Sequence, residues 1–374
     1  MSKIKNKWIK IALFLCPFIA LIPQLLIGVN VNPLWQDEYT FYRITQELPS
    51  TATSDTWFWI DNPKTTYNSE QYWPDYVDRH DIFSKIYNTP IYVHSPIWNY
   101  AMWPIVKFAD WLADKGVVEH IETDQSRVQS AETMTIGFRI IPIILFMVTM
   151  WFVFLILQRK VGNYAYFFSI PLFVSYVILN NVAFFYWDMF MWLLVVLTLY
   201  FQEKNSKWAY LTGCLLVNTK LLIGILLLIP FMIKNKKMVF CILSFVPYWI
   251  ATGIVTGDIW WLYFHEKATV NYGWLYSFLS MDTLWLFNLP CYALVTLPIF
   301  FYAKKYALYC VLLVITIFYG WGCGISANKM QGMLISGALI FPIIAYEFNL
   351  IGKVGKLLEK LGIFKKEKEI EIED

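Results

Sequence analysis

The stretch FRIIPIILFMVTMWFVFLILQRK, residues 138–160, decides the fold class. Residues 138–157 are almost all apolar, and the basic pair Arg159-Lys160 follows them. A helix of about 20 apolar residues crosses the hydrocarbon core of a bilayer, and basic residues at its end favour the cytoplasmic side. This stretch therefore predicts a membrane-spanning helix that ends in the cytoplasm.

Apolar runs of this kind recur along the chain. Of the 374 residues, 58% are hydrophobic and 15% are charged, whereas soluble domains are about 45–50% apolar and about 25% charged. We expect an all-α polytopic membrane protein of about ten transmembrane helices, with residues 1–374 forming a single membrane domain. The net charge of +3 gives no indication of a nucleic-acid partner. Further predicted spans lie at 9–29, 164–179, 182–201, 207–233, 238–255, 284–302, 306–323 and 333–348.

The run 207–233 determines the predicted topology, because lysines flank both of its ends. Its middle holds Asn218-Thr219-Lys220, and a lysine at the bilayer centre costs about 2.5–3.5 kcal/mol. A hairpin of two short helices would instead place Lys220 at the far surface or in a watery cavity. We therefore count two spans here, which makes the span number even and puts both termini, including the charged tail 352–374, in the cytoplasm.

One large polar loop, residues 31–135, follows the first span on the outer side of the membrane. Within it, residues 97–112 are apolar but interrupted by Lys107 and Asp110, which predicts a helix lying at the membrane interface. The chain contains no Walker loop and no GxGxxG, HExxH, CxxC or GxSxG motif. This excludes ATP-driven transport within the chain and the commonest soluble-enzyme chemistries.

Acidic and histidine side chains stand at the two ends of this loop. Asp37-Glu38 follows the first span, where a carboxylate is either a general base at the membrane surface or simply a solvated acid at a helix exit. His94 precedes Pro96, which can open the interfacial helix, although an ordinary loop histidine gives the same pattern. His94, His265 and a carboxylate would also make a plausible set of ligands for a divalent metal.

Charged residues at the predicted span ends are candidates for phosphate binding. Arg139 is either a snorkelling anchor or a phosphate ligand. Asp188 lies inside the fourth span, where a carboxylate needs a partner or a cavity, so it is a structural pair or a site residue. Lys220 and Lys329 fall at outer turns and either bind an anionic headgroup or face water.

Taken in order, these features resemble the GT-C superfamily of membrane glycosyltransferases. The closest likeness is to the branch with protein O-mannosyltransferases and lipid A aminoarabinose transferases. Asp37-Glu38 resembles its acidic pair, His94-Ser95-Pro96-Ile97 its HPPL or KPPL motif, and Arg139 its arginine at the second span. Asp188 and the segment ending in Asn218-Thr219-Lys220 resemble its aspartate in the fourth span and its LTK stretch.

The resemblance implies an inverting transferase that moves a sugar from a polyprenyl-phosphate donor to a hydroxyl of a glycan, lipid or protein acceptor. Asp37, with Glu38 beside it, would be the general base. The donor phosphate would be held by His94, Arg139, Lys220 and Lys329. A prokaryotic plasma membrane is the expected location, and membrane lipid the surrounding partner.

Two other functions fit the same residues. One is a transporter or flippase of a lipid-linked saccharide, although the polar residues gather on one side of the membrane rather than at its middle. The other is a non-catalytic subunit of GT-C type. Two departures from the family pattern keep this alternative open: Ser95 stands where the family has proline, and Asn328-Lys329-Met330-Gln331 is a poor match to the family's late outer turn.

Overall fold

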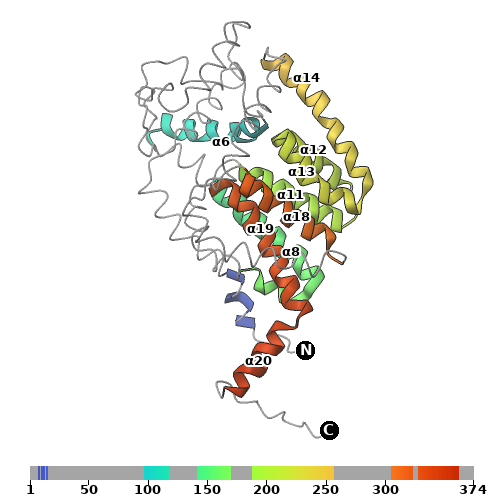
Figure 1. Ribbon diagram of the computed structural model, residues 1–374. Coiled ribbons are helices and arrows are strands. Elements are labelled where there is room, and N and C mark those ends of the chain that lie inside the picture. Colours follow the sequence, from blue (N-terminus) through green and yellow to red (C-terminus); the bar gives the residue numbers. More distant parts are fainter. Residues whose placement is uncertain are drawn as a thin grey trace, which may run out of the picture.

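The computed structural model describes residues 7, 8, 10–12, 14, 15, 97–117, 141–169, 188–256, 305–322 and 327–361. These residues form helices and turns and contain no strand (Figure 1), which confirms the all-α prediction for this part of the chain. The elements are α6 (Ile97–Asp114), α8 (Ile141–Val161), η3 (Gly162–Ser169), α11 (Asp188–Glu203), α12 (Trp208–Thr219), α13 (Leu221–Lys234), η4 (Lys236–Ser244), α14 (Phe245–Thr256), α18 (Ala307–Gly322), α19 (Ala327–Glu347) and α20 (Leu350–Lys360).

Among the described helices, one is long and apolar enough to cross a membrane by length and composition. It runs over Ile144–Phe168, through α8 and the 3-10 helix η3 that continues it, and overlaps the predicted span 138–157. Shorter apolar helices cover Met189–Glu203, Ile223–Lys234, Ala307–Thr316 and Leu334–Glu347. The predicted number of about ten spans remains a prediction.

The core lies where α8, α11 and α19 meet. Trp192 of α11 is fully buried, and its indole ring lies directly against Gly332 of α19. A side chain at position 332 would overlap this ring, so glycine is required for the two helices to approach this closely. At the N-terminus, Phe14 packs edge-on against Trp151 and Phe154 of α8, which attaches the first helical residues to the bundle.

Helices α12 and α13 form the predicted hairpin. Gly224 of α13 lies against Leu216 and Val217 of α12, and Lys220 between them is extended, with φ −150° and ψ 106°. The arms have 12 and 14 residues, or about 18 and 21 Å at a rise of about 1.5 Å per residue. Both arms are shorter than a bilayer core of about 30 Å, in agreement with the hairpin of two short helices that we expected here.

The predicted span 238–255 is also built differently from expectation. Its first part is the 3-10 helix η4 and only its second part, α14, is α-helical. Pro247 sits in the first turn of α14 and has no N–H to donate to the carbonyl of Leu243, which disfavours a continuous α-helix through this junction. At about 2.0 Å per residue in η4 and 1.5 Å in α14, the two together rise about 36 Å, enough to cross a bilayer.

Candidate functional site

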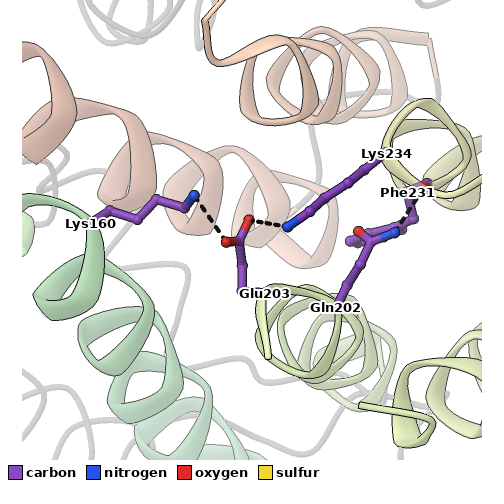
Figure 2. Close-up of polar contacts among 5 residues, drawn as sticks. All are labelled: Lys160, Gln202, Glu203, Phe231 and Lys234. Carbon is purple, nitrogen blue, oxygen red and sulfur yellow. Dashed lines mark hydrogen bonds and ion pairs between the residues drawn. The ribbon is translucent and has the colours of Figure 1, made fainter. Parts of the chain in front are cut away.

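A partly exposed ion-pair cluster joins the C-terminal ends of three helices (Figure 2). The Nζ atoms of Lys160 in α8 and Lys234 in α13 lie 2.9 and 3.1 Å from the two carboxylate oxygens of Glu203 in α11. The neighbouring Gln202 donates from Nε2 to the carbonyl oxygen of Phe231 at 2.8 Å. These contacts fix the three helix ends against one another, and we call this end of the bundle the Glu203 end.

The charge of Glu203 is maintained by its two lysines. Burial alone would raise the pKa of the Glu203 carboxyl, but the hydrogen bonds and positive charges of Lys160 and Lys234 outweigh that effect and lower the pKa below its usual range. The carboxylate is therefore ionised at neutral pH, and its role is to hold two cations rather than to exchange a proton.

Other cations gather at the Glu203 end and lie over aromatic rings. Lys204 lies 4.3 Å and Arg159 5.1 Å from the centroid of the Tyr200 ring. Lys160 lies 5.4 Å from that of Tyr309. Cations also suit the negative ends of helix dipoles, and α8, α11 and α13 all end here. This end is thus strongly basic.

The opposite end of the bundle contains the helix starts. Because Lys160 contacts Glu203 and the Phe152 ring lies 5.0 Å from that of Tyr200, α8 and α11 lie side by side and run in the same direction. Their first residues therefore lie together at the far end. Helix α13 also ends at Glu203, so its start, next to Lys220, lies there too, and we call this the Lys220 end.

Helix α19 begins at the Lys220 end as well. Gly332, near its start, packs on Trp192, which is one turn after Asp188 in α11. Its last residues lie at the other end, where Glu347 accepts a hydrogen bond from Tyr306 at 2.6 Å. The backbones of Asp188 and Lys329, the latter being the third residue of α19, are thus at the same end as Lys220.

The start of α6 is attached near the hairpin tip. The backbone N–H of Ile97 donates to the Tyr248 hydroxyl of α14 at 3.1 Å, which satisfies one of the free N–H groups at this helix start. Asn218, two residues before Lys220, donates to the Ser244 hydroxyl at 3.0 Å, which holds the hairpin tip against the start of α14.

The predicted site residues divide into two groups. Lys220 is partly buried at the hairpin tip, and for Asp188 and Lys329 the structure gives the backbone position just described. Asp37, Glu38, His94, Arg139 and His265 lie outside the described residues. The nearest described neighbours of His94 and Arg139 in sequence, Ile97 and Ile141, are helix starts.

The metal prediction stays a prediction, because His94 and His265 are both outside the described part. Within that part, no group of three or more His, Cys, Asp or Glu side chains is arranged to hold a metal ion.

The chain matches no family model, no curated protein and no solved structure. Sequence reasoning also missed Tyr248 and the pairing of Glu203 with Lys160 and Lys234. The sequence did contain a signal for this pairing, because Glu203 and Lys160 each follow an apolar run. Opposite charges at the ends of adjacent helices commonly form ion pairs. Tyr248 gave no such signal, because its contact joins residues 151 positions apart.

Proposed function

We propose that this chain is a polytopic membrane glycosyltransferase. It moves a sugar from a polyprenyl-phosphate donor to an acceptor hydroxyl, with inversion, at the Lys220 end of the bundle. The observation that carries the proposal is the convergence of helix starts there: α8, α11, α13 and α19 all begin at this end of the bundle, and Lys220 directly precedes α13. Helix starts present free N–H groups and partial positive charge, which suit a phosphate.

The charge distribution supports an orientation. The Glu203 end carries Arg159, Lys160, Lys204 and Lys234, and an excess of lysine and arginine at span ends favours the cytoplasmic side. The Lys220 end then faces the outer leaflet, where the headgroup of a lipid-linked sugar is accessible. Helices α12 and α18 end at the Lys220 end, and their C-termini carry partial negative charge. The attraction for phosphate is therefore local to the four helix starts and Lys220 and does not extend over the whole end of the bundle.

The proposed reaction needs a base and a phosphate site. The acceptor oxygen forms a bond to the anomeric carbon while the bond from that carbon to the phosphate oxygen breaks, and the carboxylate of Asp37 takes the acceptor's proton, with Glu38 beside it. The leaving polyprenyl phosphate keeps the electron pair. Arg139, Lys220 and Lys329 would stabilise its negative charge. His94 would contribute to the same phosphate site, and a divalent metal held by His94 and His265 would add positive charge there.

Loss of the gene tests this proposal. Cells lacking the protein should accumulate one polyprenyl-phosphate-linked sugar, and expression of the wild-type chain should remove it. Asp37→Asn should not remove it, whereas the matched control Asp55→Asn, an aspartate of the same outer loop, should. Accumulation of no lipid-linked sugar, or full complementation by Asp37→Asn, would contradict the proposal.

One observation favours a second candidate, a transporter or flippase of the same lipid-linked saccharide. The half-length arms of the α12–α13 hairpin resemble the discontinuous helices that transporters use at the bilayer midplane. The two functions differ in their products. A transporter in sealed vesicles would move the labelled lipid-linked sugar between leaflets and leave it attached to its carrier, whereas a transferase releases the polyprenyl phosphate.

A further inference from the structure

Helix α20 carries an apolar stripe that the rest of the described chain leaves exposed. Val354, Leu357 and Leu361 are 52%, 54% and 62% exposed. With successive residues turned by about 100°, these three side chains fall within an arc of about 60°. Leu350, at the start of the helix, is partly buried against the core. The stripe therefore begins at the bundle and continues out of it.

A second stripe, of lysines, runs beside the first. Lys353, Lys356 and Lys360 are all exposed and also lie within an arc of about 60°, centred about 100° from the apolar stripe. A helix with adjacent apolar and lysine faces is typical of segments that lie in the plane of a membrane surface, with the apolar side chains among the acyl chains and the lysines at the headgroups. The charge of the lysines selects anionic lipid.

The junction before α20 is a built turn. Asn349 has φ 48°, in the left-handed region that asparagine tolerates better than most residues, and this separates α20 from α19. The Asn349 side chain accepts a hydrogen bond from the Tyr164 hydroxyl at 3.0 Å. It also lies against Gly352, where a larger residue would collide with it. The helix thus leaves the Glu203 end of the bundle from a fixed point, and Figure 1 shows it projecting beyond the other described helices.

We infer that α20 docks on the anionic lipids of the leaflet at the Glu203 end and anchors the C-terminus there. The inference depends on the membrane setting of the proposed function but not on sugar transfer. It keeps the tail 352–374 on the cytoplasmic side, as we expected, and adds a lipid partner for the part of it that lies in α20. The Glu203 end already carries Arg159, Lys160, Lys204 and Lys234, so the lysine stripe of α20 extends a basic surface that an anionic leaflet would attract.

The test is hydrogen–deuterium exchange of the full-length protein in nanodiscs. Discs of phosphatidylcholine alone are compared with discs of equal phosphatidylcholine and phosphatidylglycerol. Each lysine near an anionic surface strengthens binding about fivefold, so three together predict docking on the order of a hundredfold stronger in the anionic discs. Exchange of the peptide covering residues 350–361 should be at least about tenfold slower there, and 0.5 M NaCl should remove most of the difference.

Two triple variants separate the lysine stripe from general charge. Lys353→Gln with Lys356→Gln and Lys360→Gln should abolish the difference between the two kinds of disc. The matched control removes three exposed lysines elsewhere at the Glu203 end and should preserve it. These lysines are Lys207, Lys236 and Lys237.

Three outcomes would overturn the inference. The first is equal exchange of the 350–361 peptide in both kinds of disc, and the second is an effect of the control variant on this exchange as large as that of the α20 variant. The third is slower exchange that accompanies dimerisation, seen as a doubled protein mass per disc. Unchanged exchange of α8 and α19 peptides shows that each variant is folded. Loss of sugar transfer has no bearing on these outcomes, so failure of the proposed function and failure of this inference are distinguishable.

Discussion

Glu203→Gln should destabilise the protein more than any other substitution that removes a single charge at the Glu203 end of the bundle. The variant removes the carboxylate that accepts from Lys160 and Lys234, and it leaves two ammonium groups facing each other across a neutral amide. A hydrogen bond to a charged group contributes about 1.5–3 kcal/mol. Because the lysine side chains are 28% and 37% exposed, solvent screening reduces the two bonds together to about 2 kcal/mol.

The assay is thermal unfolding of the purified protein in detergent, followed by tryptophan fluorescence at a fixed scan rate. For a chain of 374 residues, a loss of about 2 kcal/mol should lower the midpoint by about 2–3 °C. Glu347→Gln is the matched control, since its partner Lys305 has a side chain that is 64% exposed. An exposed pair of this kind contributes less than about 1 kcal/mol. An equal effect of the two substitutions would refute the reasoning.

The effect of Glu203 should also depend on pH. The pKa of Glu203 is lower in the folded protein than its ordinary value near 4.5, so its contribution is complete above pH 4.5 and disappears as the pH falls through the folded-state pKa. The difference in midpoint between wild type and Glu203→Gln should therefore be constant from pH 7 to pH 5 and shrink below pH 4.5. A difference that grows on acidification would contradict the assignment.

Three further predictions follow from the same geometry. Gly332→Ala should lower the unfolding midpoint by the equivalent of about 1–3 kcal/mol, because the added methyl group overlaps the Trp192 ring, and an unchanged midpoint would show that α11 and α19 are not in contact. Tyr248→Phe removes the hydroxyl that accepts from the Ile97 N–H, a hydrogen bond that contributes about 1 kcal/mol. Hydrogen exchange at the start of α6 should therefore become about fivefold faster, while exchange in α19 stays unchanged. Lys220→Gln should raise the KM for the lipid-linked donor about tenfold without moving the unfolding midpoint, with partial recovery in Lys220→Arg.

Much of the helical framework could be predicted from the sequence. The apolar runs around 138–157 and 306–323 coincide with α8 and α18, because long apolar runs bounded by charge leave little alternative to a buried helix. The run 333–348 lies almost wholly within α19, but this helix begins at Ala327, so Lys329, which we expected at an outer turn, lies in its first turn. The interfacial helix expected at 97–112 is α6, and its start at Ile97 follows Pro96 directly. These helices could be predicted because each depends on a pattern of neighbouring residues in the sequence.

What could not be predicted depends on contacts between distant residues or on backbone details. The break at Lys220 and two short helices were expected from its charge, but the outer limits of the arms depend on backbone details: α12 begins after the turn at Asn205, and α13 ends at Lys234, before Asn235. Glu203 was taken as the end of a span, and its two partners lie 43 and 31 positions away. The residues of the candidate site were chosen because their motifs resemble those of GT-C glycosyltransferases. The structure adds that Asp188, Lys220 and Lys329 lie at the same end of the bundle.

The central claim is that the chain transfers a sugar with Asp37 as the base. The most direct measurement uses the purified protein in proteoliposomes with the lipid-linked sugar extracted from cells that lack the gene, and it follows release of the polyprenyl phosphate. We predict release by the wild type, a loss of at least about a thousandfold in kcat for Asp37→Asn, and little change for Asp55→Asn. Release by Asp37→Asn at the wild-type rate, or sugar that crosses the membrane still attached to its carrier, would contradict the account.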